Sequence, residues 1–462
     1  MMARAILAAV LCVMICCAVG LADEELIPAF PGAEGFGAVA TGGRGGRVIK
    51  VTTLDPTGPG SLNEAVQTEG PRIVVFEVSG VIKGDVTITQ PNLTIAGQTA
   101  PGAGITIEGM LRTRYRVQPP ADNLIIRFLR VRPQRPKGRT HSGDAIQITN
   151  VDRLIIDHVS CSWGNDENMD LCNSRNLTVQ WCTIEESDPV GHSKGHAHNF
   201  GMIMGYAGKN ATVHHNLFAH HSKRAPLSGL EVLDHRNNVI YNMLLPFIFH
   251  PPRMNRLRPD EPFRVNVIGN YIKDGPEVEK QMQGRAFHRL FWKLSFIEPH
   301  VADNVCTWLD GPAELPEGES VKEPWPAPKV QTESAEEAYE RVLAIAGCLP
   351  RDAVSQRTIE EVRTGGGKWE RREPEGGLMA GLEPGEPPRD SAGDGIPDVW
   401  KKTHGLDPDD PNIATGIVPK GASKDDRHAG YTWIEFYINE LADKLIAEAE
   451  AAAGLRDPAE PE

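Results

Sequence analysis

The sequence of 462 residues carries a formal net charge of −14, with 40% hydrophobic and 24% charged residues. This length and composition are typical of a globular protein with a large core and room for more than one domain. The acidic balance argues against a general nucleic-acid binder. The 46 glycines and 36 prolines predict many turns.

Residues 1–22 have the pattern of a secretory signal peptide. Arg4 precedes an apolar run, and Gly20-Leu21-Ala22 fits a small-residue cleavage site. An uncleaved membrane anchor is the alternative, but the run is shorter than the ~20 residues that a span requires. We therefore expect a secreted or periplasmic protein without membrane contact once this leader is removed.

Five of the eight cysteines lie beyond the leader: Cys161, Cys172, Cys182, Cys306 and Cys348. An odd number without regular spacing indicates neither a disulfide framework nor a CxxC metal site. We expect small buried hydrophobic residues, with at most one disulfide bridge.

Residues 28–47 are dense in glycine. This predicts either a flexible loop or backbone that packs where only glycine fits. A strand at 48–55 follows, and Ser61 with Glu64 forms a capping box that begins a short helix.

Short runs rich in β-branched residues recur from residue 86 onwards, at offsets of 21 to 34 residues. The aligned positions are Thr94, Ile125, Ile155, Thr178, Thr212, Leu233 and Val265. Such a repeat predicts a solenoid of β-coils over residues 23–310, with loops inserted where the offset is longer. Asparagines near the corners, such as Asn123, Asn238 and Asn270, tolerate tight bends and can bond to the next coil. A β-sandwich is the alternative, but hairpin turns are scarce between the runs.

The C-terminal third changes character. We expect an extended segment and a helix packed on the solenoid at 311–363, a linker at 364–389 and a disordered tail at 446–462. The helix would start at the capping box of Ser334 and Glu337.

A small acidic module is expected at 390–445, closed by an amphipathic helix that starts near residue 430. Its start, 390–398, resembles a calcium loop, but Ala392 and Lys401 replace an aspartate and the bidentate glutamate. We therefore expect weak or no calcium binding there and a capping or attachment role. Deletion of 386–462 would then leave the function of the solenoid largely intact.

A basic strip at 112–139 precedes a cluster of carboxylates. The strip holds nine lysines and arginines against one acidic residue, Asp122. The carboxylates are Asp144, Asp166 and Asp170, with Asp157 and Glu167 near them. Positions one coil apart stack in a solenoid, so these side chains can converge, and several hard oxygens at one point suit Ca²⁺. The combination suggests a polyanionic ligand held together with a cation.

Seven of the fifteen histidines lie within 192–221: His192, His196, His198, His214, His215, His220 and His221. A zinc site is one reading. Structural histidines and substrate contacts are favoured, because no helix places two of them on one face. Lys194 lies within this run, and Arg224 follows it in a loop one or two coils from the aspartates.

Together these motifs resemble the pectate lyase family of polysaccharide lyases. The resemblance covers residues 28–363 and rests on DAIQI (144–148), IDHVSCSWGNDENMD (156–170), ATVHHN (211–216) and SKRAP (222–226), with FPGAEGFGAVATGGRGG (30–46) and GSLNEAV (60–66) upstream. It implies a right-handed parallel β-helix that cleaves polygalacturonate by calcium-dependent β-elimination, which leaves unsaturated oligogalacturonates.

The resemblance also implies a ligand set for calcium. Asp144, Asp166 and Asp170 fall on the positions of the family's calcium carboxylates. Ser142 stands where the family has a further aspartate, so the set is one carboxylate short. We therefore expect modest calcium affinity in the absence of substrate.

Arg224 falls on the catalytic arginine of the family, and Lys194 falls near a lysine that meets a substrate carboxylate. Gly229 replaces a second family arginine, whose contact Arg253 would supply. His196 and Arg139 are further candidates for substrate binding. Because arginine is ordinarily protonated, only a strongly positive neighbourhood would favour its neutral form, which predicts an alkaline optimum.

Two alternatives remain open. One is a polygalacturonase-type hydrolase on the same β-helix, with Asp166 and Asp170 as paired acids. The other is a non-catalytic β-helix that binds a uronate polymer, which Ser142 and Gly229 would suit. In each case the expected partner of the monomeric protein is polygalacturonate or a related polyuronate, and not nucleic acid.

Overall fold

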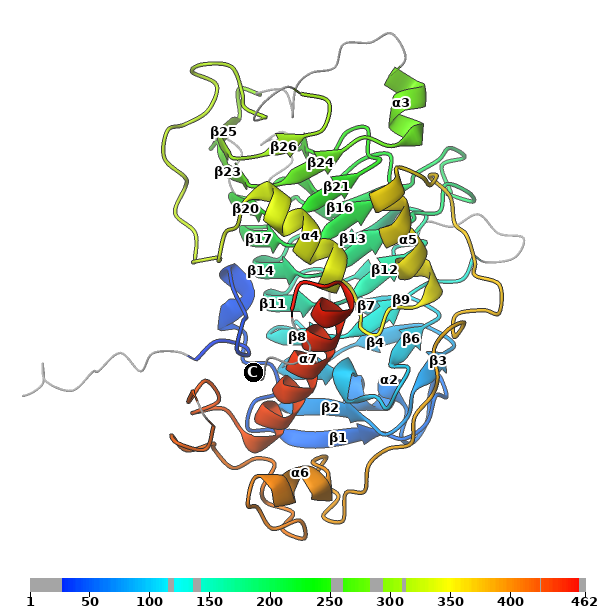
Figure 1. Ribbon diagram of the computed structural model, residues 1–462, viewed down its shortest axis with the longest axis vertical. Coiled ribbons are helices and arrows are strands. Elements are labelled where there is room, and N and C mark those ends of the chain that lie inside the picture. The colour runs from blue at the N-terminus through cyan, green and yellow to red at the C-terminus, as the bar shows by residue number, and fades with distance from the viewer. Residues whose placement is uncertain are drawn as a thin grey trace, which may run out of the picture.

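The computed structural model describes residues 27–114, 120–135, 143–250, 261–282, 294–309, 313–423 and 425–456. Within them, three parallel sheets of ten, nine and seven strands run side by side. From Val86 to Lys273, each coil takes one strand of the seven-stranded sheet, then one of the ten-stranded sheet, then one of the nine-stranded sheet (Figure 1). The prediction of a right-handed parallel β-helix is confirmed.

The ten-stranded sheet consists of β1 (Arg47–Val51), β2 (Arg72–Phe76), β5 (Leu93–Ala96), β8 (Leu124–Arg127), β11 (Asp152–Asp157), β14 (Arg175–Gln180), β17 (Asn210–His214), β20 (Val232–Arg236), β23 (Phe263–Ile268) and β25 (Ile297–Ala302). The nine-stranded sheet consists of β3 (Gly80–Ile82), β6 (Ile105–Ile107), β9 (Leu129–Val131), β12 (Ser160–Ser162), β15 (Thr183–Glu185), β18 (Leu217–Ala219), β21 (Val239–Tyr241), β24 (Tyr271–Lys273) and β26 (Val305–Cys306). The seven-stranded sheet consists of β4 (Val86–Ile88), β7 (Leu111–Thr113), β10 (Ile146–Gln147), β13 (Glu167–Asp170), β16 (Phe200–Met204), β19 (Leu227–Ser228) and β22 (Ile248–Phe249). The helices are η1 (Phe36–Val39), α2 (Leu62–Gln67), η2 (Gly97–Thr99), α3 (Pro276–Met282), α4 (Ala335–Ile345), α5 (Ala353–Thr364), α6 (Asp398–Thr403) and α7 (Trp433–Ala452).

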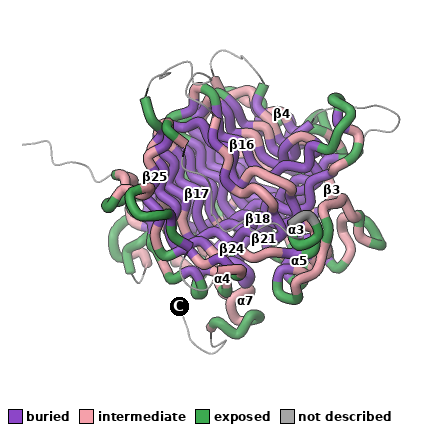
Figure 2. The backbone as a smooth tube through the Cα atoms, turned by 90° about the horizontal axis from the view of Figure 1, so that it is seen from above, coloured by how far each residue is buried: buried purple, intermediate pink, exposed green. Residues whose placement is uncertain are grey.

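The core lies inside the coils, where equivalent apolar side chains stack from one coil to the next. Leu124, Leu154 and Leu177 occupy paired positions on three successive strands and are all buried. Figure 2 shows buried strands lining the interior of the helix along its length. Burial of this kind is the main stabilising term in a solenoid, because each coil covers the apolar face of its neighbour.

Asparagines form a ladder at one corner, as the sequence predicts. The amide of Asn216 donates to Asn238 at 2.9 Å, that of Asn238 to Asn270 at 3.1 Å, and that of Asn270 to Asn304 at 2.8 Å. Asn92 and Asn123 adopt positive φ at another corner and are also bonded to each other. The ladder satisfies buried corner groups and fixes the register between coils.

The glycine-dense segment packs tightly on the ten-stranded sheet. A Cβ at Gly37 would lie 2.3 Å from the carbonyl oxygen of Leu154, and one at Gly43 would lie 1.9 Å from that of Arg72. Of the two predicted roles for these glycines, close backbone packing is therefore correct.

Helices α4 and α5 cover the nine-stranded sheet (Figure 1). Val342 and Leu343 of α4 and Val362 of α5 pack against Leu217 and Tyr241 of the sheet. The predicted capping box of Ser334 and Glu337 starts α4. The sequence pattern predicts one helix in 311–363, whereas the structure contains both α4 and α5 there.

The C-terminal module packs on the first coils. Ile434 and Ile438 of α7 share a cluster with Ile73 and Val75 of β2. Helix α7 continues to Ala452, so residues 446–452 are helical where the sequence analysis expects a disordered tail. Because this contact is apolar and buried, we expect deletion of 386–462 to lower the melting temperature.

Lys401 follows the calcium-loop-like segment, at the position where such a loop has its bidentate glutamate. Its side chain is fully buried, and its Nζ lies 2.8 Å from Asp394 Oδ2. Asp390 is paired with Lys50 at 3.3 Å, and Asp398 accepts from the Ser391 amide at 2.7 Å. Protein donors thus engage these carboxylates, which supports the prediction of weak or no calcium binding.

We predict that Lys401→Ala destabilises the protein by about 3–5 kcal/mol, because it leaves the buried Asp394 carboxylate unpaired. The exposed neighbour supplies a matched control, since Lys402→Ala should change the free energy of unfolding by less than about 0.5 kcal/mol. Denaturant unfolding of both variants checks this. Equal effects of the two substitutions would contradict it.

Three described arginines of the basic strip serve the fold. Arg127 pairs with Asp157 at 2.7 Å, Arg132 pairs with Asp352 at 2.8 Å, and Arg130 is fully buried. The expectation that the strip faces a polyanion is therefore wrong for these three arginines. Their carboxylate and carbonyl partners come partly from the C-terminal third, more than 200 residues away in sequence.

The five cysteines beyond the leader are buried free thiols, so the single disulfide bridge allowed above is not formed. Among the described residues, no helix combines the length and the apolar character that crossing a membrane needs. The proposed leader, residues 1–22, lies outside the described residues.

Candidate active site

The candidate site lies on the seven-stranded sheet, just before its strands begin. Asp144 precedes β10, Asp166 precedes β13, and Arg224 precedes β19. The parallel register pairs Ile146 with Met169. The coil repeat therefore sets Asp144 and Asp166 on neighbouring coils, as the sequence predicts, and places Arg224 two coils beyond Asp166.

The carboxylates crowd together. Asp144 is 4% exposed and accepts from the Glu167 amide and from the Gln147 side chain, both at 2.9 Å. Ligand oxygens of Asp144, Asp166 and Glu167 all lie within 4.8 Å of one another. Burial, and then repulsion from Asp170 and Asp166, raises the pKa of Asp144 well above its ordinary value. Burial also raises the pKa of Asp170, although its carboxylate accepts from the Cys172 amide.

Arg224 reaches over this group. Its guanidinium forms an ion pair with Glu167 and lies 4.1 Å from the centre of the Phe200 ring. Burial lowers the pKa of Arg224 to about 10, although Asp166 and Asp144 oppose the shift. The Nε atom is buried without a hydrogen-bond partner among the described residues. This arginine is therefore held beside the carboxylates and is easier to deprotonate than an exposed one.

The loop before β16 brings histidines to Asp166. His192 Nε2 lies 3.5 Å and His198 Nε2 lies 3.6 Å from its carboxylate oxygens. Burial lowers the pKa of His198 to about 4. Lys194 and His196 are exposed on the same loop.

The other four histidines of the run are buried and support the fold. His221 bonds to the Ser187 hydroxyl and to the Ile184 carbonyl, and His220 lies 3.0 Å from Glu361 of α5. His214 and His215 contact each other, and His215 stacks on Trp181 at 4.3 Å. These four fit the structural role that the sequence analysis favours.

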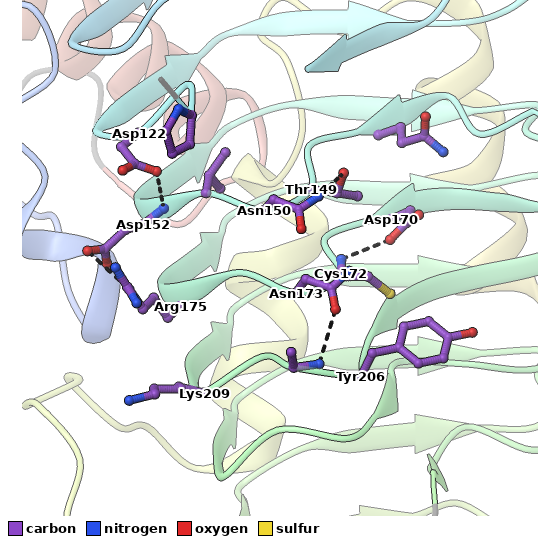
Figure 3. A pocket seen from close by; sticks show the side chains of 14 residues that line it. Asp122, Thr149, Asn150, Asp152, Asp170, Cys172, Asn173, Arg175, Tyr206 and Lys209 are labelled. Atoms are coloured by element: carbon purple, nitrogen blue, oxygen red, sulfur yellow. Dashed lines mark hydrogen bonds and ion pairs between the residues drawn. The ribbon is translucent and has the colours of Figure 1, made fainter. Parts of the chain in front are cut away.

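A pocket of about 730 Å³ adjoins the carboxylates at the turns that lead into the ten-stranded sheet. Asp170 and Tyr206 lie toward one side of it, and Arg175 and Lys209 lie toward the other (Figure 3). Tyr206 is 39% exposed, so the pocket offers an aromatic surface next to the carboxylate group.

Some residues beside the site could not be placed there from the sequence. His250 takes up space beside Gly229, since a Cβ on Gly229 would lie 3.3 Å from that of His250. Its ring lies 5.0 Å from that of Tyr206. Neither residue belongs to a motif, and only the register of the later coils brings them to the site. Ser142, Arg139 and Arg253 lie outside the described residues.

The fold and the site define a class: a parallel β-helix protein that presents carboxylates and an arginine on one sheet.

No family model matches the sequence. Curated relatives do match, among them "Probable pectate lyase C" of Aspergillus fumigatus, 34% identical over 434 residues, which are 89% of this chain and 93% of the relative. The protein of the same name from Neosartorya fischeri is 35% identical over 430 residues, with the same two coverages. A pectate trisaccharide-lyase of Thermotoga maritima is 26% identical over 209 residues, 42% of this chain and 52% of the relative.

Solved structures agree on the fold. A pectate lyase bound to a hexasaccharide matches 71% of this chain and 99% of its own, with a TM-score of 0.50 and 14% identity. Another pectate lyase, studied for its anti β-elimination mechanism, matches 70% of this chain and 99% of its own, with a TM-score of 0.50 and 15% identity. Given the sequence relatives, the chain belongs to the pectate lyase family, and as a member it is a polysaccharide lyase.

Proposed function

We propose that the protein is a calcium-dependent pectate lyase that cleaves polygalacturonate by β-elimination and releases unsaturated oligogalacturonates. The observation that carries this proposal is the placement of Arg224 beside a crowded, partly buried carboxylate group on one sheet. The names of the relatives support the choice of substrate.

The chemistry of the donor set fits calcium. Asp144, Asp166 and Asp170 offer hard oxygen ligands, which Ca²⁺ prefers. Asp144 is buried and Asp170 is partly buried. Burial and repulsion between the carboxylates raise the pKa of both, so a bound cation would stabilise their charged forms. When bound, Ca²⁺ supplies positive charge against the uronate carboxylate and so stabilises negative charge that develops at C5.

Arg224 acts as the base in this proposal. In its neutral form it takes the proton from C5, the C5–H electron pair forms the double bond to C4, and the glycosidic oxygen leaves C4 with the electron pair of the C4–O bond and takes up a proton from water. Phe200 and Glu167 hold the guanidinium in place. Lys194, His196, Arg139 and Arg253 are proposed to bind substrate carboxylates, with Lys194 also adding positive charge near the reaction.

The lowered pKa of Arg224 gives a direction for the pH dependence. With a pKa of about 10, the neutral fraction is about one in a thousand at pH 7 and about one in ten at pH 9. We therefore expect kcat to rise with pH from neutral to alkaline conditions. A rate profile that falls over this range would contradict Arg224 as the base.

An ultraviolet assay on polygalacturonate tests the reaction type. We expect absorbance from unsaturated ends in the presence of Ca²⁺, its loss with a chelator, and its recovery when Ca²⁺ is added back. Reducing ends without ultraviolet absorbance would indicate a polygalacturonase-type hydrolase. Calcium-dependent binding of the polymer without turnover would indicate a non-catalytic polyuronate-binding protein. Secretion through the leader at 1–22 and a monomeric state also remain proposals.

A further inference from the structure

The histidine loop meets the carboxylate group at Asp166. One ligand atom from each of Asp166, His192 and His198 lies within 4.8 Å of the other two. Asp166 also belongs to the group with Asp144 and Glu167. Asp166 therefore lies between two groups of possible ligands: the carboxylates of Asp144 and Glu167, and the imidazoles of His192 and His198.

The spacing of these atoms suits two ligands of one metal better than a hydrogen bond. The N···O distances of 3.5 and 3.6 Å exceed the usual range for N–H···O bonds. Ligand atoms on one tetrahedral Zn²⁺, with bonds of ~2.0–2.1 Å, lie about 3.4 Å apart. The rings of His192 and His198 stack at 4.1 Å and 8°, so both Nε2 atoms face Asp166 from the same side.

His196 extends the set. Its Nδ1 lies 3.2 Å from the Lys194 carbonyl, which can only accept, so Nδ1 carries the proton and Nε2 keeps its lone pair. Histidine ligands are commonly oriented by such a backbone carbonyl. The His196 ring lies 5.1 Å from that of His198 and is exposed, so it can turn toward the space between Asp166, His192 and His198.

Charge favours a cation here. Carboxylate oxygens of Asp144, Asp166 and Glu167 lie within 4.8 Å of one another, and Arg224 is paired with one of them, Glu167. The group therefore keeps an excess of negative charge that a cation would offset.

We propose that Asp166, His192 and His198, with His196 as a fourth ligand, form a site for a nitrogen-preferring divalent transition metal such as Zn²⁺. The site adjoins the proposed calcium site and shares Asp166 with it. Imidazole nitrogens prefer such metals over Ca²⁺, which takes oxygen ligands. In this proposal Ca²⁺ binds Asp166 together with the other carboxylates, and Zn²⁺ binds Asp166 together with the histidines.

One local change accompanies binding. The Lys194 amide lies 3.2 Å from His192 Nδ1 and donates to it. A metal on Nε2 requires the proton on Nδ1, so this amide must turn away. We expect the Lys194 amide signal in an NMR spectrum to shift when Zn²⁺ is added.

Titration of the purified protein with Zn²⁺ in saturating Ca²⁺, against a chromophoric chelator, tests the site. We expect one site of micromolar or tighter affinity. His198→Ala and His192→Ala should each weaken Zn²⁺ binding at least about 100-fold. Loss of a residue that only hydrogen-bonds to a metal ligand already lowers metal affinity by about 10–100-fold. Calcium affinity should not change in these two variants, whereas Asp166→Asn should weaken the binding of both Ca²⁺ and Zn²⁺. Ser193→Ala, on the same loop, is the matched control and should bind Zn²⁺ as the wild type does.

Zinc-edge X-ray absorption of the wild-type complex covers the case in which a histidine variant fails to fold. Two or more imidazole ligands are expected. No zinc binding by the wild type, a spectrum with oxygen ligands alone, or unchanged affinity in folded His198→Ala would each overturn the proposal. The proposed lyase activity is measured separately, so the failure of one does not imply the failure of the other.

Discussion

Replacing Arg224 with lysine should lower kcat by about 10²–10⁴-fold, the usual contribution of a general base. Lysine keeps the positive charge but loses the planar fork that pairs with Glu167 and lies over Phe200. The group that remains cannot reach the C5 proton in the same geometry. Initial rates from the ultraviolet assay at fixed Ca²⁺ measure the effect, and calorimetry with trigalacturonate measures binding, which should survive nearly unchanged.

Arg236→Lys is the matched control for this result. Arg236 is paired with Asp234 at 2.8 Å on the ten-stranded sheet, away from the carboxylate group, so its kcat should stay within about twofold of wild type. A loss under about tenfold in Arg224→Lys would point to another base, with Lys194 and then His196 next in line. Collapse of binding together with turnover would make Arg224 a substrate clamp.

Asp170→Asn should abolish calcium-dependent activity and yet stabilise the calcium-free protein. The raised pKa of Asp170 shows that its charged form is disfavoured by burial and by Asp166. When the pKa of a carboxyl group is higher in the folded than in the unfolded protein, the folded protein becomes less stable as the pH rises above the unfolded pKa near 4. A neutral amide removes this penalty at pH 7, so the calcium-free melting temperature should rise. The increase in melting temperature that Ca²⁺ gives the wild type should be absent.

Asp85→Asn separates this effect from a general loss of negative charge. Asp85 is 41% exposed and paired with Arg112 at the edge of the same sheet. Its replacement should leave both the calcium response and the calcium-free melting temperature close to wild type. If Asp170→Asn instead keeps normal calcium affinity by calorimetry, the ligand assignment is wrong.

Much of the site follows from the coil repeat. The spacing of the runs predicts that Asp144 and Asp166 stack on successive coils, and a loop after the following coil brings Arg224 to them. Asn238 and Asn270 likewise take their predicted places, because corner positions repeat with the coil. A solenoid has this property because neighbours in space lie about one repeat apart in sequence.

Contacts with the C-terminal third do not follow the repeat. In the sequence, Arg132 is one of many cations that are expected to be exposed. In the structure it is fully buried and paired with Asp352, 220 residues later. The pair of Arg224 with Glu167 is also hidden in the sequence, since Glu167 lies next to the aspartate that matches the family pattern. Where a segment from outside the coils covers a sheet, composition alone cannot tell a buried ion pair from a ligand-binding charge.

The most direct test of the proposed site is a crystal structure of Arg224→Lys with Ca²⁺ and an oligogalacturonate. We predict an ion about 2.3–2.6 Å from carboxylate oxygens of Asp144, Asp166 and Asp170, the usual range for Ca²⁺–O bonds. We also predict a galacturonate whose C5 faces residue 224. An ion bound elsewhere, or an oligosaccharide whose C5 lies beyond the reach of residue 224, would contradict the account.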